Sequence, residues 1–136
     1  MDAKEYLESV KLQNRKVDIM RTNLRMLREA LGIKSPNFES DGSSRSTRPT
    51  DRMAEAICKV IDYEAELKEE EAKLAILRFE VEKAIEHLED RNEREVLKRK
   101  YLLFQSLETI MTEMCYSESS IYTFHRNGMK NFAVNC

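Results

Sequence analysis

Small hydroxyl side chains, one aromatic ring and two cations lie close together in "SESSIYTFHRNGMK", residues 117–130. On a helix whose apolar residues face a core, such groups form the opposite face. Hydroxyl and aromatic side chains near the start of that helix could touch base edges in a DNA major groove, and cations further along could touch phosphates. An ordinary solvated helix face has the same pattern, so periodicity alone leaves both interpretations open. The predicted contact residues are Ser117, Glu118, Ser119, Ser120, Tyr122, Thr123, Arg126 and Lys130.

A second basic group, Lys98, Arg99 and Lys100, precedes this segment and is predicted to contact phosphate. Within the segment itself, Tyr122 and Thr123 are the residues that we expect at base edges. Arg126 and Lys130 are expected at the flanking phosphates.

Other kinds of site find little support in the sequence. His87 and His125 are isolated from each other, and the three cysteines are widely spaced, at positions 58, 115 and 136. This spacing predicts no metal site and no disulfide framework. A glycine-rich phosphate loop and a Ser, His, Asp ordering are both missing from the sequence. The run "EAELKEEEAK" is typical of a solvated helix face. We therefore expect no enzyme activity, no metal and no cofactor.

The contact residues require short helices to position them, and 91–136 predicts three. Asn92 can cap the first, Ser106 the second and Ser117 the third, with "CYS" turning the chain between the last two. Helices this short share a core only if they cross steeply, as in a helix-turn-helix. The expected core residues are Val96, Leu97, Tyr101, Leu102, Leu107, Ile110, Met111, Met114, Ile121, Phe124, Gly128 and Phe132.

Two long helices precede this domain. In 1–32 the apolar residues Val10, Val17, Leu24 and Leu31 recur every seven positions, and Gly32 can end the helix in a left-handed conformation. The second long segment, 51–90, contains a helix over 51–88 with a similar repeat. Its repeat residues are Met53, Val60, Leu67, Leu74, Val81 and Leu88. Folding back as an antiparallel hairpin hides both repeats, and parallel dimerisation of each helix is the alternative.

The segment between them, 33–50, contains both prolines of the chain, one glycine and five serines, which predicts a flexible linker. The predicted fold is therefore all-α, with a long antiparallel helical hairpin (a coiled coil) followed by a small three-helix helix-turn-helix domain. Because the second helix carries more apolar surface than the first can cover, we also predict a homodimer formed through the hairpin.

Charge limits how such a protein could bind DNA. Residues 91–136 hold seven basic and five acidic residues, a net charge of +2, whereas 1–90 hold 16 and 20, a net charge of −4. Phosphate neutralisation supplies most non-specific affinity, so one copy is expected to bind weakly. Dimerisation, or contact with RNA polymerase, would raise the effective concentration of the domain at DNA.

The stretch "EREVLKRKYLLFQSLETIMTEMCYSESSIYTFHRNGMKNF" resembles the fourth conserved region of bacterial sigma factors. The matching features are "EREVL", "SLETI", the Ser117 cap and Ile121. From its "AKEYL" start onward, the chain is similar to short proteins of Gram-positive phages and prophages, related to the ArpU and RinA types of transcription regulator. It departs from that family where "HRNGM" replaces an "HGRAL"-like string, and where Met111 replaces a small residue.

The resemblance implies a phage or prophage regulator that binds double-stranded DNA in the cytoplasm of a bacterial host. The alternative is a coiled-coil interaction protein that binds no DNA and docks on RNA polymerase, a sigma factor or another phage protein. No apolar run in the sequence approaches the roughly 20 residues that a membrane span needs, and we expect no membrane association.

Overall fold

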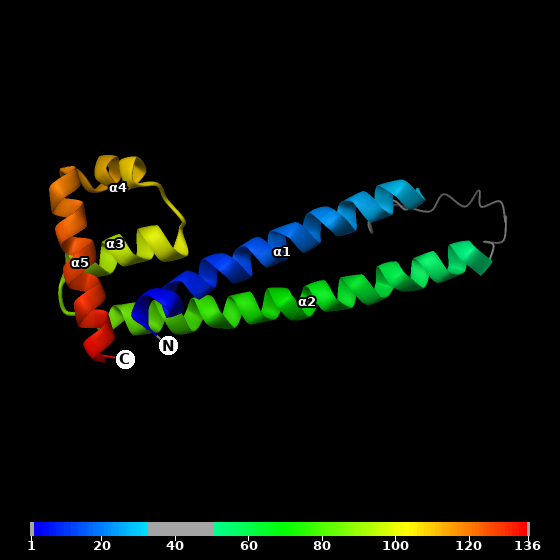
Figure 1. Cartoon of the computed structure of the whole chain (residues 1–136), viewed down its shortest axis with the longest axis horizontal. Coiled ribbons are helices and arrows are strands. Elements are labelled where there is room, and N and C mark those ends of the chain that lie inside the picture. The colour runs from blue at the N-terminus through cyan, green and yellow to red at the C-terminus, as the bar shows by residue number, and fades with distance from the viewer. Residues whose placement is uncertain (1, 33–50, 136) are drawn as a thin grey trace. The chain divides into compact units, whose positions relative to one another are not determined.

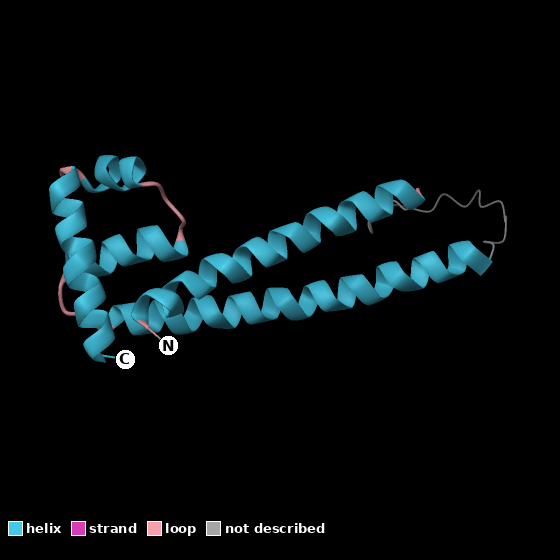
Figure 2. Cartoon of the chain, viewed as in Figure 1, coloured by secondary structure: helices cyan, strands magenta, loops and turns pink. Residues whose placement is uncertain are grey.

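A computed structural model describes residues 2–32 and 51–135, with side chains up to Phe132. These residues form α1 (Ala3–Leu31), α2 (Asp51–Glu86), α3 (Arg91–Leu97), a π-helical turn η1 (Lys98–Leu102), α4 (Leu107–Met114) and α5 (Glu118–Asn135). Within these ranges every regular element is a helix (Figure 2). The all-α prediction is confirmed. The predicted linker, 33–50, lies outside the described residues.

The chain divides into two compact units. One comprises Met1–Arg15 with Ala72–Cys136, and we call it the head unit; the other, Lys16–Glu71, we call the paired-helix unit. The head unit therefore contains the start of α1 and the end of α2 as well as α3 to α5. The predicted segment boundaries followed the helix ends, whereas this division falls within both long helices.

In the paired-helix unit, α1 and α2 run antiparallel. Lys16 is 3.1 Å from Glu70, whereas Arg28, further along α1, is 2.6 Å from Glu64, earlier in α2. The buried apolar side chains belong to the predicted seven-residue repeats: Val17, Leu24, Val60 and Leu67. Gly32 ends α1 with φ +73° and donates its N–H to the carbonyl of Glu29 at 3.1 Å, as predicted. This pairing is compatible with the predicted hairpin.

The head unit has a larger and more mixed core. Leu7 and Val10 of α1 and Val81 and Ile85 of α2 are fully buried in it. The ring of Tyr6 stacks on Phe132 of α5, with 6.1 Å between the ring centroids. In this unit α5 runs crosswise to both α3 and α4 (Figure 1). The predicted three-helix core is thus extended by the first turns of α1.

The first short helix begins differently from the prediction. Asp90, not Asn92, caps α3, and its side-chain oxygen accepts hydrogen bonds from the N–H groups of Asn92 at 2.8 Å and Glu93 at 3.2 Å. Asp and Asn can both cap a helix, and because Asp90 takes this role, α3 begins two residues earlier than predicted. The end of α2 is also two residues earlier than predicted, at Glu86.

A π-helical turn follows α3 and was not predicted. The N–H of Leu103 bonds to the carbonyl of Lys98 at 3.0 Å, and the N–H of Gln105 to that of Arg99 at 3.0 Å. Phe104 then has φ +55°, with the guanidinium of Arg78 5.8 Å from its ring centroid. This wide turn buries Tyr101 and Leu102 and leads the chain into α4.

Candidate nucleic-acid interface

The turn between α4 and α5 sets the geometry of the candidate interface. Only Cys115, Tyr116 and Ser117 separate the two helices. Cys115 adopts the left-handed conformation, φ +61°, and its N–H bonds to the carbonyl of Met111 at 2.9 Å. A turn of three or four residues between crossed helices is the connection found in helix-turn-helix proteins. The predicted break at "CYS" is confirmed.

Two serines cap the helices on either side, as predicted. The Ser106 hydroxyl accepts the N–H of Thr109 at 3.2 Å, and the Ser117 hydroxyl accepts the N–H of Ser120 at 3.3 Å. Beneath them, Val96, Ile110 and Ile121 form a buried cluster that holds α3, α4 and α5 together. The start of α5 is therefore fixed both by its cap and by its core residue.

Most of the predicted contact side chains lie together on the exposed face of α5. Tyr122 is 53% exposed, and Ser120 alone among them is partly buried. The exposed members are Ser117, Glu118, Ser119, Tyr122, Thr123, Arg126 and Lys130. The Thr123 hydroxyl donates to the carbonyl of Ser119 at 2.9 Å, which fixes its rotamer and leaves its oxygen lone pairs available.

The three residues of the predicted basic group, Lys98, Arg99 and Lys100, differ in their contacts. Lys98 lies 3.5 Å from Glu86, and Arg99 bonds to Glu95 at 2.9 Å, to Gln105 at 3.2 Å and also to Glu113. The hydrogen bond that Arg99 donates to Glu95 contributes most to raising the pKa of Arg99. Arg99 therefore ties α3 to α4, and its Nε and Nη1 groups already donate to these partners. Lys100 is the exposed member of the group.

A small hollow joins Lys100 to the face of α5. Its volume is about 100 Å³, and its wall includes Lys100, Gln105, Tyr122 and His125 above apolar side chains of the core cluster. The structure thus brings Lys100 and Tyr122 to one surface, although they are 22 positions apart. Gln105 was not predicted to take part. Its position depends on the π-helical turn, for which the sequence carries no periodic signal.

His125 lies beside the candidate face but points into the head unit. Its Nε2 is 2.9 Å from the hydroxyl of Tyr101. Burial, with the nearby charges of Lys100 and Lys4, lowers the pKa of His125 to about 4, and burial raises the pKa of Tyr101 to about 12. At neutral pH the Tyr101 hydroxyl therefore donates to an uncharged imidazole. This hydrogen bond joins η1 to α5 on the buried side of the candidate face.

Gly128 allows α5 to approach α3 closely. A Cβ at this position would lie 3.3 Å from Cβ of Glu93 and 3.4 Å from a methyl carbon of Leu97. Next to this crossing, the amide of Asn131 donates to the buried carboxylate of Glu93 at 2.8 Å. The glycine that weakens α5 as an isolated helix thus provides the space for the helix crossing.

Two further observations concern the described residues only. Their His, Cys, Asp and Glu side chains do not gather in groups of three or more that could hold a metal ion. Within the same part of the chain, no helix has the length and apolar character needed to span a membrane.

Comparison with protein-family models, curated proteins and solved structures gives no match for this chain. The resemblance to sigma-factor region four and to short phage proteins stays a prediction from the sequence.

Proposed function

We propose that the chain is a phage or prophage transcription regulator that reads double-stranded DNA through α5 in the cytoplasm of a bacterial host. The observation that carries the proposal is the three-residue turn between α4 and α5, in which Cys115 is left-handed, followed by an exposed polar face on α5. The first two turns of a recognition helix meet base edges, and in α5 these turns carry Ser119, Tyr122 and Thr123.

The phosphate contacts in this proposal come from Lys100, Arg126 and Lys130, which are all exposed. Lys98 and Arg99 would have to leave Glu86 and Glu95 before they could reach a phosphate. Since few cations are available, the affinity of one copy is low. Pairing of two copies, or tethering to RNA polymerase, compensates by raising the local concentration.

Alanine substitutions in α5 test this assignment. Arg126→Ala or Lys130→Ala should weaken binding to all DNA sequences alike and reduce the slope of log affinity against log salt by about one unit per contact. Thr123→Ala should instead reduce preference for the selected site, by about 1–3 kcal/mol for a good base contact. Arg15→Ala, an exposed cation of α1, is the control and should change neither quantity.

The alternative is a protein that binds RNA polymerase, a sigma factor or another phage protein without touching DNA. It is favoured by Glu118, which is exposed at the start of α5 where a DNA phosphate would repel it. In that case selection from random or phage DNA would enrich no sequence. The same alanine substitutions would then reduce only the capture of polymerase or of a phage protein.

A further inference from the structure

The long helix α2 carries a second apolar repeat on a face that stays exposed. The buried repeat runs through Val60, Leu67, Leu74 and Val81, whereas the exposed one follows alternating steps of four and three residues. These steps are those of a coiled-coil contact line. Its members, all exposed, are Ala54, Cys58, Ile61, Ala65, Lys68, Ala72, Ala75 and Phe79, and we call them the outer repeat.

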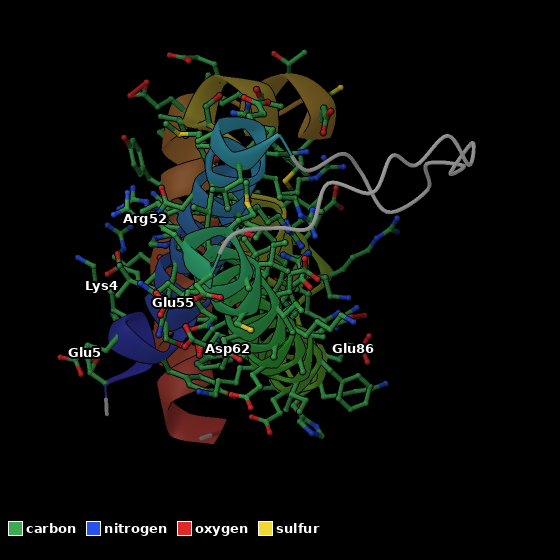
Figure 3. The ribbon with its side chains drawn as sticks, turned by 90° about the vertical axis from the view of Figure 1, so that its right-hand side faces the viewer. Lys4, Glu5, Arg52, Glu55, Asp62 and Glu86 are labelled. Atoms are coloured by element: carbon green, nitrogen blue, oxygen red, sulfur yellow. The ribbon has the colours of Figure 1, made fainter. Side chains whose placement is uncertain are left out.

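Two large side chains show that the outer repeat is not an ordinary solvated face. Ile61 is 58% and Phe79 59% exposed, and Ile76 beside them is 60% exposed. By helical spacing, many charged residues of α2 lie on another face, among them Arg52 and Glu55, which Figure 3 shows on the other side of the helix from Glu86. Near the outer repeat, the ammonium of Lys83 lies 5.4 Å from the ring centroid of Phe79. One helix that presents two apolar lines separated from its charged face is typical of packing against two neighbours.

We propose that the outer repeat of α2 packs antiparallel against the same repeat of a second copy. If Ala54 of one copy lies opposite Phe79 of the other, Ile61 lies opposite Ala72 and Cys58 opposite Ala75. Each large side chain then meets a small one, which keeps the distance between the two helices even. A parallel pair would instead place Phe79 against Phe79 and Ala65 against Ala65, with a bulge and a gap.

Charge favours the same register. Lys68 is the one charged member of the outer repeat, and on its own helix the acids within reach are Glu64 and Glu71. Those two carboxylates already bind Arg28 and Arg21 of α1, at 2.6 and 2.8 Å. In the antiparallel register Lys68 crosses Ala65 of the other copy, whose neighbours Asp62 and Glu69 are acidic. A parallel pair would place Lys68 against Lys68.

This inference does not depend on whether α5 binds DNA. It specifies which surface forms the dimer, and it differs from the buried repeat that led to the dimer prediction from sequence. A second possible occupant of the outer repeat is the outer face of α1 of another copy, where Leu12, Ile19 and Met26 are exposed at intervals of seven. The experiments below distinguish the two.

Light scattering of the full chain should give twice the monomer mass of 16.0 kDa at micromolar concentration. Ile61→Glu should raise the dimer dissociation constant at least tenfold. Ile19→Glu, at a site of matching exposure (60%), should leave it unchanged. A mass of 16.0 kDa for the unaltered chain at high concentration overturns the proposal. So does a dimer that Ile19→Glu disrupts, whether or not Ile61→Glu also disrupts it, because the outer face of α1 would then be part of the contact.

Disulfide cross-linking tests the register, in a chain carrying Cys115→Ser and Cys136→Ser so that Cys58 is the remaining thiol. Two copies of Cys58 lie about 25 Å apart in the antiparallel register, so oxidation should give little linked dimer. Adding Ala75→Cys should convert most of the chain to linked dimer. Adding Glu80→Cys, on the charged face, should not. Efficient linkage through Cys58 alone, or equal linkage with Ala75→Cys and Glu80→Cys, overturns the antiparallel pairing.

Discussion

The head unit and the paired-helix unit hold their helices together in different ways. In the paired-helix unit a repeated layer of Val or Leu is flanked by exposed ion pairs such as Arg21–Glu71. The head unit depends on contacts that occur once, among them the Tyr6–Phe132 stack and the Tyr101–His125 hydrogen bond. A repeated layer spreads stability over equivalent positions. Contacts that occur once fix the position of particular side chains, as a recognition surface requires.

The largest expected difference between the units comes from emptying a core position in each. Phe132→Ala should lower the free energy of unfolding by about 3–5 kcal/mol, because Phe132 is fully buried and its ring stacks on Tyr6. Leu24→Ala in the paired-helix unit should cost nearer 2 kcal/mol, since two helices can close partly over the space. Urea unfolding followed by circular dichroism measures both. Equal losses would remove the distinction between the units.

The two described glycines have different roles: Gly128 leaves space for a neighbouring helix, whereas Gly32 adopts a left-handed backbone conformation. Gly128→Leu should cost about 1–3 kcal/mol, because its side chain would press on Glu93 and Leu97. Gly32→Ala should cost about 1 kcal/mol, because Gly32 has φ +73° with nothing within 4 Å of a new Cβ. Thermal unfolding of both variants tests this. Stabilisation by Gly128→Leu would mean that α5 does not pack closely on α3.

Acidification should act on the head unit through His125. Its pKa is about 4 in the folded chain and 6.5 in the unfolded chain, so the unfolded state binds more protons between these values. The stability that the uncharged His125 contributes to the folded state is fully present above pH 6.5 and is lost as the pH falls towards 4. It should amount to on the order of 1 kcal/mol, since the ring is partly exposed. The test is the difference between the free energies of unfolding at pH 7 and pH 4.5. In His125→Gln this difference should be smaller than in the unaltered chain, by that amount.

The smallest effect is expected from an ion pair of the paired-helix unit. Arg28→Ala removes the contact with Glu64 and should cost 1 kcal/mol or less, because both side chains remain partly solvated. The loss should shrink in about 0.5 M salt, where such pairs are screened. Chemical denaturation at two salt concentrations measures it. If Arg28→Ala instead lowers the free energy of unfolding by several kcal/mol at both salt concentrations, this ion pair is a main source of stability in its unit.

Much of the fold could be predicted because it depends on local signals. The seven-residue repeats indicated which faces of α1 and α2 are buried, and serine caps indicated the starts of α4 and α5. The stacking of Tyr6 on Phe132 could not be predicted. A repeat indicates which face is buried but not which helix covers it. The π-helical turn was missed for a related reason, since its i to i+5 hydrogen bonds leave no periodic pattern in five residues.

The candidate site was predictable only in part. Helical spacing was enough to place Thr123 and Arg126 on the exposed face of α5. Lys98, Arg99 and Lys100 were all predicted to contact phosphate, but whether each is available depends on acids distant in sequence, such as Glu86 and Glu113. Pairing between charges on different helices follows from tertiary structure. Counting cations along the chain therefore overestimates how many can reach a phosphate.

Site selection from random and phage genomic DNA tests the central claim most directly. Because one copy is expected to bind weakly, the protein is presented both alone and bound to RNA polymerase. If α5 reads DNA, one sequence should be enriched in at least one of the two experiments. The Thr123→Ala variant should lose preference for it while Arg15→Ala keeps it. Absence of any enriched sequence with the protein both alone and bound to polymerase would contradict the claim.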